Sequence, residues 1–395
     1  MTRSKKTVLI KSNLLDLSSR FPKEIKALTK EGYLVSFLGW DRDNNSSISL
    51  LRETEKLQEE IKLRLRAPYG IKVLPFLPIW WGFVFLQLMI KDWDIAHAVN
   101  LDSAIPAVIV GKLKRKLVIY DMPDVYEDQV RLPKLLRTFC IKLDKLCMRL
   151  ASGVILSDEM QIEEVGGIPN SKVIVVYDSP PDIWDKVEKT HRTGKGFTLF
   201  FAGGLSSARA LNLDNVFTAI KDIEGVRLMI TGHGDLIGRI KEWARQMPEK
   251  IQFLGWIDSR EEVLKSIINE ADLLFVLRDP NIPLNKYISG AKSLDARMCG
   301  KPLLVNQGTS ASIKVSQENC GLVIEDAANS EEIKQAIVKL RDNPELCREL
   351  GANARKAYEQ KYNWQIMEQR LIALYRGLTS EMMGGQECQT SSKLA

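Results

Sequence analysis

The feature that most constrains this chain is an alternation of strands and helices that stops once and then starts again. Apolar runs typical of strands occur at 7–10, 33–40, 95–99, 116–121, 153–157 and 172–179. Helical patterns separate them, and strands interleaved with helices predict a parallel sheet of the doubly wound type. Residues 180–196 interrupt this order with two prolines, two glycines and mixed charge, which is typical of a linker.

The alternation restarts after the linker. Further strands are predicted at 197–204, 227–232, 251–256, 271–277, 301–306 and 320–325. The sequence therefore predicts an α/β protein with two Rossmann-like domains, residues 1–182 and 195–361. A closing helix is expected at 362–378, and the polar residues 379–395 are expected to form a flexible tail. Ligands of such sheets bind at the carboxyl ends of the strands, so functional residues are sought in the loops that follow strands.

Composition excludes several classes of protein. The 395 residues are 45% apolar and 27% charged, unlike a disordered, collagen-like or coiled-coil chain. A net charge of +6 does not require nucleic acid as a partner. The six cysteines form no CxxC pair and there are three histidines, which argues against a zinc cluster. Buried free thiols and a cytoplasmic location are expected. The first apolar run stops after four residues, which predicts a strand and not a signal peptide.

One segment of the first domain is unusually apolar. Residues 73–90 hold no charge over 18 positions, the bare minimum for a membrane span. Pro75, Pro78 and Gly82 argue against a clean spanning helix. Two interpretations remain ahead of a true span: a buried or half-buried helix of the first domain, or an element lying in the membrane interface.

A basic amphipathic helix is predicted close by. Residues 130–150 place leucines and Phe139 at helical spacing, with six basic side chains against one acidic residue, Asp144. Such a helix either packs on a core with a solvated outer face or contacts anionic lipid headgroups. Together with the basic run at 112–116 and the apolar segment 73–90, it favours peripheral attachment to the cytoplasmic face of a membrane.

Two glycine turns of the second domain follow predicted strands. Residues 201–212 (FAGGLSSARALN) place Gly203 and Gly204 before a helix, whose free N–H groups favour a phosphate, and Arg209 adds a positive charge. Residues 231–236 (TGHGDL) repeat the arrangement around His233. Its two glycines, Gly232 and Gly234, permit close approach of a ligand to the backbone.

A third motif is GAKSLDARMCGKPLLV at 290–305. Lys292 and Asp295 are three residues apart and lie on the same side of one helical turn. They form either a surface ion pair or a nucleotide-recognition pair, with the lysine on a diphosphate and the carboxylate on ribose hydroxyls.

In their order and spacing, these motifs resemble the GT-B-fold glycosyltransferases of the retaining family 4 (glycosyl transferases group 1). GGLSSARAL resembles the family's donor-phosphate loop, TGHGDL its second glycine turn, and KSLDARMCGKPLLV its K-x-x-E-x-M-A-x-G-K-P-V motif. Residues 18–43, DIAHAVNLDS and VIYDMPDVYED resemble its first domain, and YNWQIMEQRLIALY resembles its final helix. The resemblance covers about 370 residues and implies a cleft between two domains, with the final helix crossing back to the first.

The resemblance also implies roles for individual residues. Arg209 and Lys292 match the cations on the donor diphosphate, and Asp295 matches the carboxylate on the ribose. Gly203, Gly204, Gly232, His233 and Gly234 match the turns around the donor. The chain departs from the family pattern in four places: Asp295 replaces a glutamate, Tyr287 a second acidic residue, Gly204 an arginine and Pro123 a histidine.

The function implied is glycosyl transfer from a nucleotide-diphosphate sugar to an acceptor hydroxyl, with retention and without a metal or other cofactor. Asp121 or Asp124 either orients the acceptor or caps the turn that follows, and His97 is either a satisfied strand-end residue or a substrate contact. A DRD triplet at 41–43 is interpreted as a charged loop rather than a metal site. The apolar segment and the basic helix suggest a lipid-linked or membrane-proximal acceptor. Two alternatives stay open: an inactive homologue acting as a partner subunit, and a sugar-nucleotide 2-epimerase.

Overall fold

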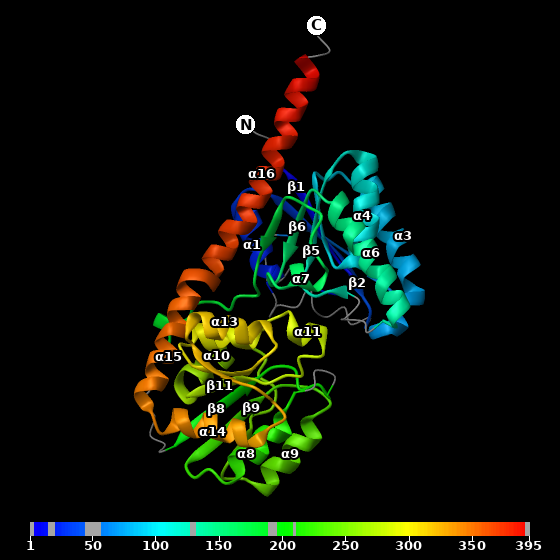
Figure 1. The fold of residues 1–395 in the computed structure, drawn as a ribbon. Coiled ribbons are helices and arrows are strands. Elements are labelled where there is room, and N and C mark those ends of the chain that lie inside the picture. Colours follow the sequence, from blue (N-terminus) through cyan, green and yellow to red (C-terminus); the bar gives the residue numbers. More distant parts are fainter. Residues whose placement is uncertain are drawn as a thin grey trace. The chain divides into compact units, whose positions relative to one another are not determined.

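The computed structural model describes residues 4–14, 20–43, 57–126, 132–188, 196–207 and 211–391 (Figure 1). The chain divides into two compact units. The first unit contains residues 1–177 and 367–395, and the second contains residues 178–366. Each unit is built on its own parallel sheet, as predicted.

The sheet of the first unit has seven strands in the order β3-β2-β1-β4-β5-β6-β7. All its neighbouring strands pair in parallel. The strands are β1 (Lys6–Lys11), β2 (Leu34–Asp41), β3 (Leu57–Arg64), β4 (Ile95–Val99), β5 (Leu117–Met122), β6 (Gly153–Leu156) and β7 (Val173–Val175). Strand order reverses beside β1, which is where a doubly wound sheet places its ligands.

Helices cover both faces of this sheet (Figure 1). They are α1 (Phe21–Lys30), α3 (Leu77–Ile90), α4 (Leu101–Lys114), α6 (Lys134–Leu150), α7 (Gln161–Glu164) and α16 (Trp364–Ser391), with a 3-10 turn, η1 (Gly70–Phe76), before α3. Helices α3, α4 and α6 lie on one face, with α4 in contact with both others, and α1 and α16 lie on the opposite face.

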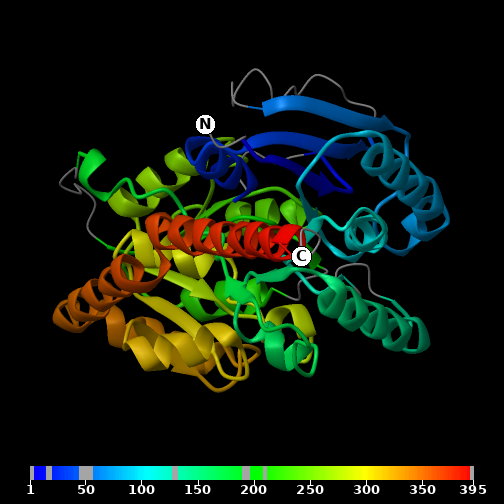
Figure 2. The ribbon, with the colours of Figure 1, turned by 90° about the horizontal axis from the view of Figure 1, so that it is seen from above.

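The sequence did not predict β3. Its residues, LQEEIKLR, are mostly charged or polar, and only Leu57 is fully buried. The strand lies at the edge of the sheet, and among the described strands it pairs with β2 alone (Figure 2). Edge strands tolerate exposed charges that a central strand could not bury, so the apolar pattern used to find strands is weak there.

The apolar segment forms η1 and α3, and α3 is a half-buried helix of the first unit. Leu77, Trp80, Val84 and Leu88 form its buried stripe, and the Trp80 ring stacks on Trp40 with centroids 5.7 Å apart. Gly70–Ile90 is long and apolar enough to cross a membrane by length and composition, and 28% of its most apolar 18-residue stretch is buried. One such helix is weak evidence of a span, and the α-helical part, at about 21 Å, is shorter than a bilayer core of about 30 Å.

The sheet of the second unit has six strands in the order β10-β9-β8-β11-β12-β13, all parallel. The strands are β8 (Phe197–Ala202), β9 (Val226–Thr231), β10 (Ile251–Phe253), β11 (Leu273–Val276), β12 (Leu303–Asn306) and β13 (Gly321–Ile324). The helices are α8 (Leu213–Lys221), α9 (Ile237–Gln246), α10 (Arg260–Glu270), α11 (Pro283–Lys286), α12 (Ala291–Met298), α13 (Ser310–Glu318), α14 (Ser330–Arg341) and α15 (Pro344–Ala357). Helices α8, α9 and α14 share one apolar core with the sheet, while α10 and α12 contact β8 and β11.

The end of the chain differs from the prediction. Helix α16 continues to Ser391, so the predicted end of the closing helix at residue 378 was wrong. Once a helix is nucleated, each further residue adds a hydrogen bond, and 379–391 contains no proline to end it, so the helix continues despite Gly384 and Gly385. Its first part is held to the first unit by Tyr375, whose hydroxyl lies 2.9 Å from His97 Nδ1.

Candidate functional site

The carboxyl ends of β8 and β9 carry the two predicted glycine turns, and the turns interlock. The Gly203 amide donates to the Thr231 carbonyl at 3.0 Å, and the Leu205 amide donates to the His233 carbonyl at 2.8 Å. A methyl group at Gly232 would lie 2.0 Å from the Gly203 oxygen, so only glycine fits there. The two turns, 28 residues apart, therefore form one hydrogen-bonded surface at the carboxyl ends of β8 and β9, here called the glycine floor.

Lys292 reaches this floor from α12. Its Nζ lies 4.8 Å from the centroid of the Phe201 ring. The same atom would lie 2.9 Å from a methyl group at Gly203, whose φ is 127°. The structure thus brings together Gly203 and Lys292, two of the residues singled out from the sequence. A cation beside a glycine turn at a strand's carboxyl end is suited to binding a phosphate.

Arg209 and Gly204 are the other two residues predicted for the donor loop. Arg209 lies outside the described residues. Gly204 has open space where a side chain would begin. The start of the following turn is held by Asp235, whose carboxylate accepts the Ser207 amide at 3.1 Å and the Ser207 hydroxyl. Those hydrogen bonds lower the pKa of Asp235.

His233 is exposed at the tip of the second glycine turn. Its ring meets the Trp256 ring edge to face, with centroids 4.5 Å apart and an interplanar angle of 89°. Trp256 follows β10 and is 53% exposed. An exposed tryptophan beside a ligand-binding edge offers a stacking surface. Trp256 was not among the predicted site residues, although a tryptophan at the end of the apolar run IQFLGW is a signal for such a position.

Asp295 lies on α12, one turn after Lys292, but its carboxylate faces a guanidinium. Arg260 Nη2 donates to Asp295 Oδ1 at 2.8 Å, and Arg260 Nη1 donates to Asp178 Oδ1 at 3.3 Å. Burial raises the pKa of Asp295, and the neighbouring Arg260 opposes that shift. The motif spacing pairs Asp295 with Lys292, whereas the structure pairs it with an arginine 35 residues earlier. Contact between Asp295 and a ribose stays a prediction.

Asp121 belongs to a buried network in the first unit. It lies in β5 with no exposed surface; one carboxylate oxygen accepts from Arg20, and the other lies 3.1 Å from His97 Nε2. Both oxygens are therefore occupied, which leaves no open face for an acceptor hydroxyl. His97 is a satisfied core residue, joined to Tyr375 and Asp121. Asp124, in the loop after β5, is half-buried.

The same network contains a potential metal-ligand set. Ligand atoms of Glu24, His97 and Asp121 lie within 4.8 Å of one another. The Arg20 guanidinium is ion-paired with both carboxylates, with its Nε 3.0 Å from Glu24 Oε1. A fixed positive charge between the carboxylates repels a cation, so the donor set does not fit a metal ion.

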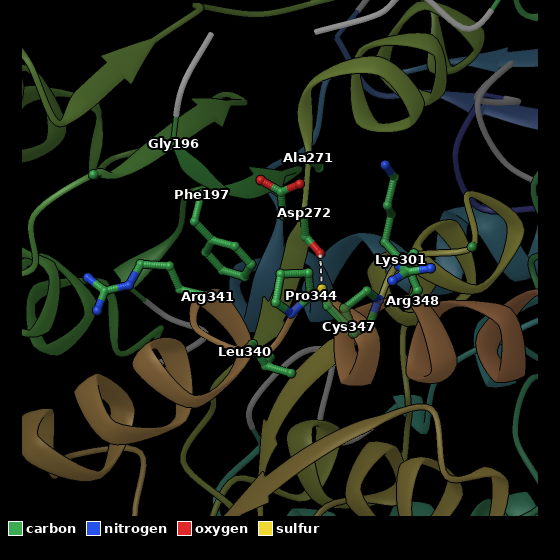
Figure 3. A pocket seen from close by; sticks show the side chains of 13 residues that line it. Gly196, Phe197, Ala271, Asp272, Lys301, Leu340, Arg341, Pro344, Cys347 and Arg348 are labelled. Atoms are coloured by element: carbon green, nitrogen blue, oxygen red, sulfur yellow. Dashed lines mark hydrogen bonds between the residues drawn. The ribbon is translucent and has the colours of Figure 1, made fainter.

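A cavity of about 570 Å³ lies at the amino ends of the strands of the second sheet, opposite the glycine turns (Figure 3). It is lined by Phe197 at the start of β8, by Pro302 just before β12, and by Cys347 of α15. Burial raises the pKa of the Cys347 thiol to about 11, which makes it a poor nucleophile at neutral pH. Parallel sheets bind ligands at the carboxyl ends of their strands, so this cavity at the amino ends is not the candidate site.

The thiols agree with the sequence prediction. Cys147 and Cys299 are buried and Cys140 is half-buried, all of them free. Burial raises the pKa of Cys147 to about 12.

Comparison with known proteins bears on the second unit. Residues 182–357 match the family model described as Glycosyl transferases group 1. The second unit is thus similar to a glycosyl transferases group 1 domain over nearly its whole length. The floor of Gly203 and Gly232, Lys292 and Asp295 all lie within the matched residues.

One curated relative is the GDP-mannose-dependent monoacylated alpha-(1-6)-phosphatidylinositol monomannoside mannosyltransferase of Corynebacterium glutamicum. It is 24% identical over 163 residues, which cover 40% of this chain and 42% of the relative. The chain spans less than half the length of the curated relatives that it matches.

Solved structures extend the likeness to both units. Sucrose-phosphate synthase of Thermosynechococcus elongatus has a TM-score of 0.76 at 15% identity, covering 95% of this chain and 100% of that one. HepE of Anabaena in complex with UDP has a TM-score of 0.68 at 15% identity, covering 94% of this chain and 100% of that one. At such identity the likeness shows the fold: two parallel-sheet Rossmann-like domains of the GT-B type.

Proposed function

We propose that the protein transfers a sugar from a nucleotide-diphosphate sugar to an acceptor hydroxyl. The observation that carries the proposal is the placement of the Lys292 ammonium against the Gly203 turn, inside the group 1 domain. Two similar proteins support the class of donor: HepE is solved with UDP, and the mannosyltransferase relative is described as GDP-mannose-dependent.

In this proposal the donor's diphosphate lies on the glycine floor of the second unit. As the glycosidic bond breaks, negative charge grows on the leaving diphosphate. Lys292 and Arg209 stabilise that charge, which is the largest kind of contribution in such sites. These cations take the place of a divalent metal, and the sugar is transferred with retention. The rings of Trp256 and His233 offer the donor an aromatic surface on which to stack.

The test is a thermal-shift titration with UDP-, GDP- and ADP-sugars, in EDTA and then in magnesium. A ligand at 100 times its Kd adds about 2.7 kcal/mol of stability, which gives an easily measured shift. A shift in EDTA with one nucleotide class is expected, followed by turnover with retained anomeric configuration by NMR. Absence of any shift with all three classes would contradict the proposal.

The same titration separates the alternatives. A 2-epimerase would bind the donor and convert it without an acceptor, which product analysis would reveal. An inactive partner subunit would bind poorly and not turn over. Tyr287 and Pro123, at altered positions of the family pattern, favour that alternative modestly.

We further propose that the acceptor is lipid-linked or membrane-proximal, and that the first unit sits on the cytoplasmic face of a membrane. Helices α3, α4 and α6, which lie side by side, expose large apolar side chains to solvent. On α6, Leu135 is 87% and Phe139 is 59% exposed. Lys134, Lys142 and Arg149 are exposed on the same helix. Apolar groups ringed by lysine and arginine fit the interface of an anionic bilayer.

Vesicle flotation tests the membrane proposal. The protein is expected to float with vesicles containing anionic phosphatidylglycerol and far less with neutral phosphatidylcholine alone. The double change Leu135→Ser and Phe139→Ser should abolish flotation, because it removes the two most exposed apolar side chains of α6. Ile162→Ser on α7, which removes another exposed apolar side chain of the first unit, is the matched control. Absence of flotation with either lipid would refute the proposal.

A further inference from the structure

Arg278 lies two residues after the end of β11, at the carboxyl end of the second sheet and next to the proposed donor site. Strand β11 lies between β8, which carries the Gly203 turn, and β12. Arg278 was not among the predicted site residues, because the segment around it, LRDPN, matches none of the glycine-turn or lysine–carboxylate motifs.

The backbone of Arg278 is clamped from β12. Its amide donates to Asn306 Oδ1 at 2.8 Å, and Asn306 Nδ2 donates back to the Arg278 carbonyl at 2.9 Å. Asn306 is 1% exposed. A backbone held by two buried hydrogen bonds fixes the direction in which the side chain leaves the strand, which is what a binding residue needs.

The guanidinium lies at the start of α12. A methyl group on Gly290, the residue that precedes this helix, would lie 3.2 Å from Arg278 Nη2 and 3.4 Å from Nη1. Gly290 has a φ of 75°, so a glycine is favoured there and the guanidinium packs directly on its backbone. Arg278 as a whole residue is 8% exposed, so this position is well packed.

Further groups suited to an anion surround the start of α12. Lys292 is on its first turn, with Nζ against Gly203. The buried hydroxyls of Ser289 and Ser310 lie 2.9 Å apart, and Ser310 is the first residue of α13. Two cations from different elements, two hydroxyls and two helix N-termini thus gather at the carboxyl ends of β8, β11 and β12.

We propose that Arg278 binds the diphosphate of the donor together with Lys292. The guanidinium offers a planar, bidentate hydrogen-bonding edge, whereas the lysine is a point charge. Arg278 thereby supplies a second fixed positive charge from the segment after β11, far from Arg209 in the sequence. This inference rests on the proposed function and adds a residue to the same site.

The test compares nucleosides with their diphosphates. Isothermal titration measures UDP, GDP and inorganic pyrophosphate, and ligand-observed NMR measures uridine and guanosine. Arg278→Met should weaken diphosphate binding roughly tenfold to a hundredfold, since a charged hydrogen-bonding partner is lost. Nucleoside binding should stay within about twofold, because the base and ribose do not contact Arg278.

Two controls accompany this variant. Arg227→Met removes an arginine near the amino end of β9, where it pairs with Glu270, and should leave diphosphate affinity unchanged. Arg278→Lys keeps the charge without the bidentate edge and should fall between wild type and Arg278→Met. It also serves as the readout if the methionine variant does not fold.

Unchanged diphosphate affinity in a folded Arg278→Met, or an equal loss for nucleoside and diphosphate, would overturn the inference. If the wild-type protein binds neither UDP, GDP nor pyrophosphate, the proposed function fails and the role of Arg278 fails with it. If wild type and Arg278→Met bind diphosphate with the same affinity, the proposed function stands and only the role of Arg278 is removed.

Discussion

Replacing Lys292 by methionine is expected to lower kcat/KM by about 10²–10³-fold with whichever nucleotide sugar proves to be the donor. Methionine keeps most of the side-chain length but removes the charge. The lost group is a cation fixed beside the Gly203 turn by its packing on Phe201. Because charge on the leaving diphosphate is greatest in the transition state, the loss should fall more on kcat than on KM.

The matched control is Lys339→Met, which removes one exposed lysine from α14 of the same unit and should leave the rate unchanged. Lys292→Arg should not restore full activity, because a planar guanidinium does not reproduce the compact ammonium that Lys292 places beside Gly203. A Lys292→Met enzyme with near wild-type kcat/KM would remove the lysine from the mechanism.

Asp121→Asn is expected to destabilise the first unit by about 1–3 kcal/mol, because it removes one of the two carboxylates that pair with the buried Arg20 guanidinium and leaves only Glu24. Hydrogen exchange read by mass spectrometry is the suitable measurement, since two units need not unfold together. Peptides of β5 and of α16 around Tyr375 should lose protection, while those of the second unit should not.

The sign of the pH dependence follows from the carboxylate. Burial acts to raise the pKa of Asp121, but Arg20 and His97 outweigh it and hold the pKa below its usual value. The stabilisation is therefore present above the unfolded pKa of about 3.9 and is lost as the pH falls through the lower folded pKa. Below pH ~4, Asp121→Asn should show a smaller loss of stability with acid than wild type.

Asp124→Asn is the control for the position of the change, since Asp124 is half-buried in the loop that follows the same strand. It should have a smaller effect on protection. If Asp121→Asn instead leaves protection intact and abolishes turnover, Asp121 is an acceptor-binding residue after all, and its network is not primarily structural.

Several features of the site were predictable because they depend on local chemistry. Glycines after apolar runs predicted the two turns, and helical spacing placed Lys292 and Asp295 on one turn of α12. The same logic failed for Arg278 and Trp256. Arg278 lies two residues after β11 and Trp256 three residues after β10, and no local pattern says which neighbours another strand will bring to them.

The partner of a buried charge could not be predicted from the sequence either. Asp295 is three residues from Lys292 in the chain, yet it pairs with Arg260 from α10. Asp121, Arg20 and His97 come from β5, the start of α1 and β4. His97 and Asp121 meet because β4 pairs with β5, and Arg20 joins them from the segment that follows β1, the strand on the other side of β4. A carboxylate in a sequence pattern is the same whether it will face a substrate or an internal guanidinium.

The sequence by itself determined the alternation of strands and helices, the division into two sheets and the glycine turns, because these follow from periodicity and backbone freedom within a few residues. Only the tertiary structure decided which charges are buried against each other and which lie beside the glycine floor. Those outcomes depend on strand order and on side chains far apart in the chain, and burial then sets whether a charge stabilises the fold or is left to meet a ligand.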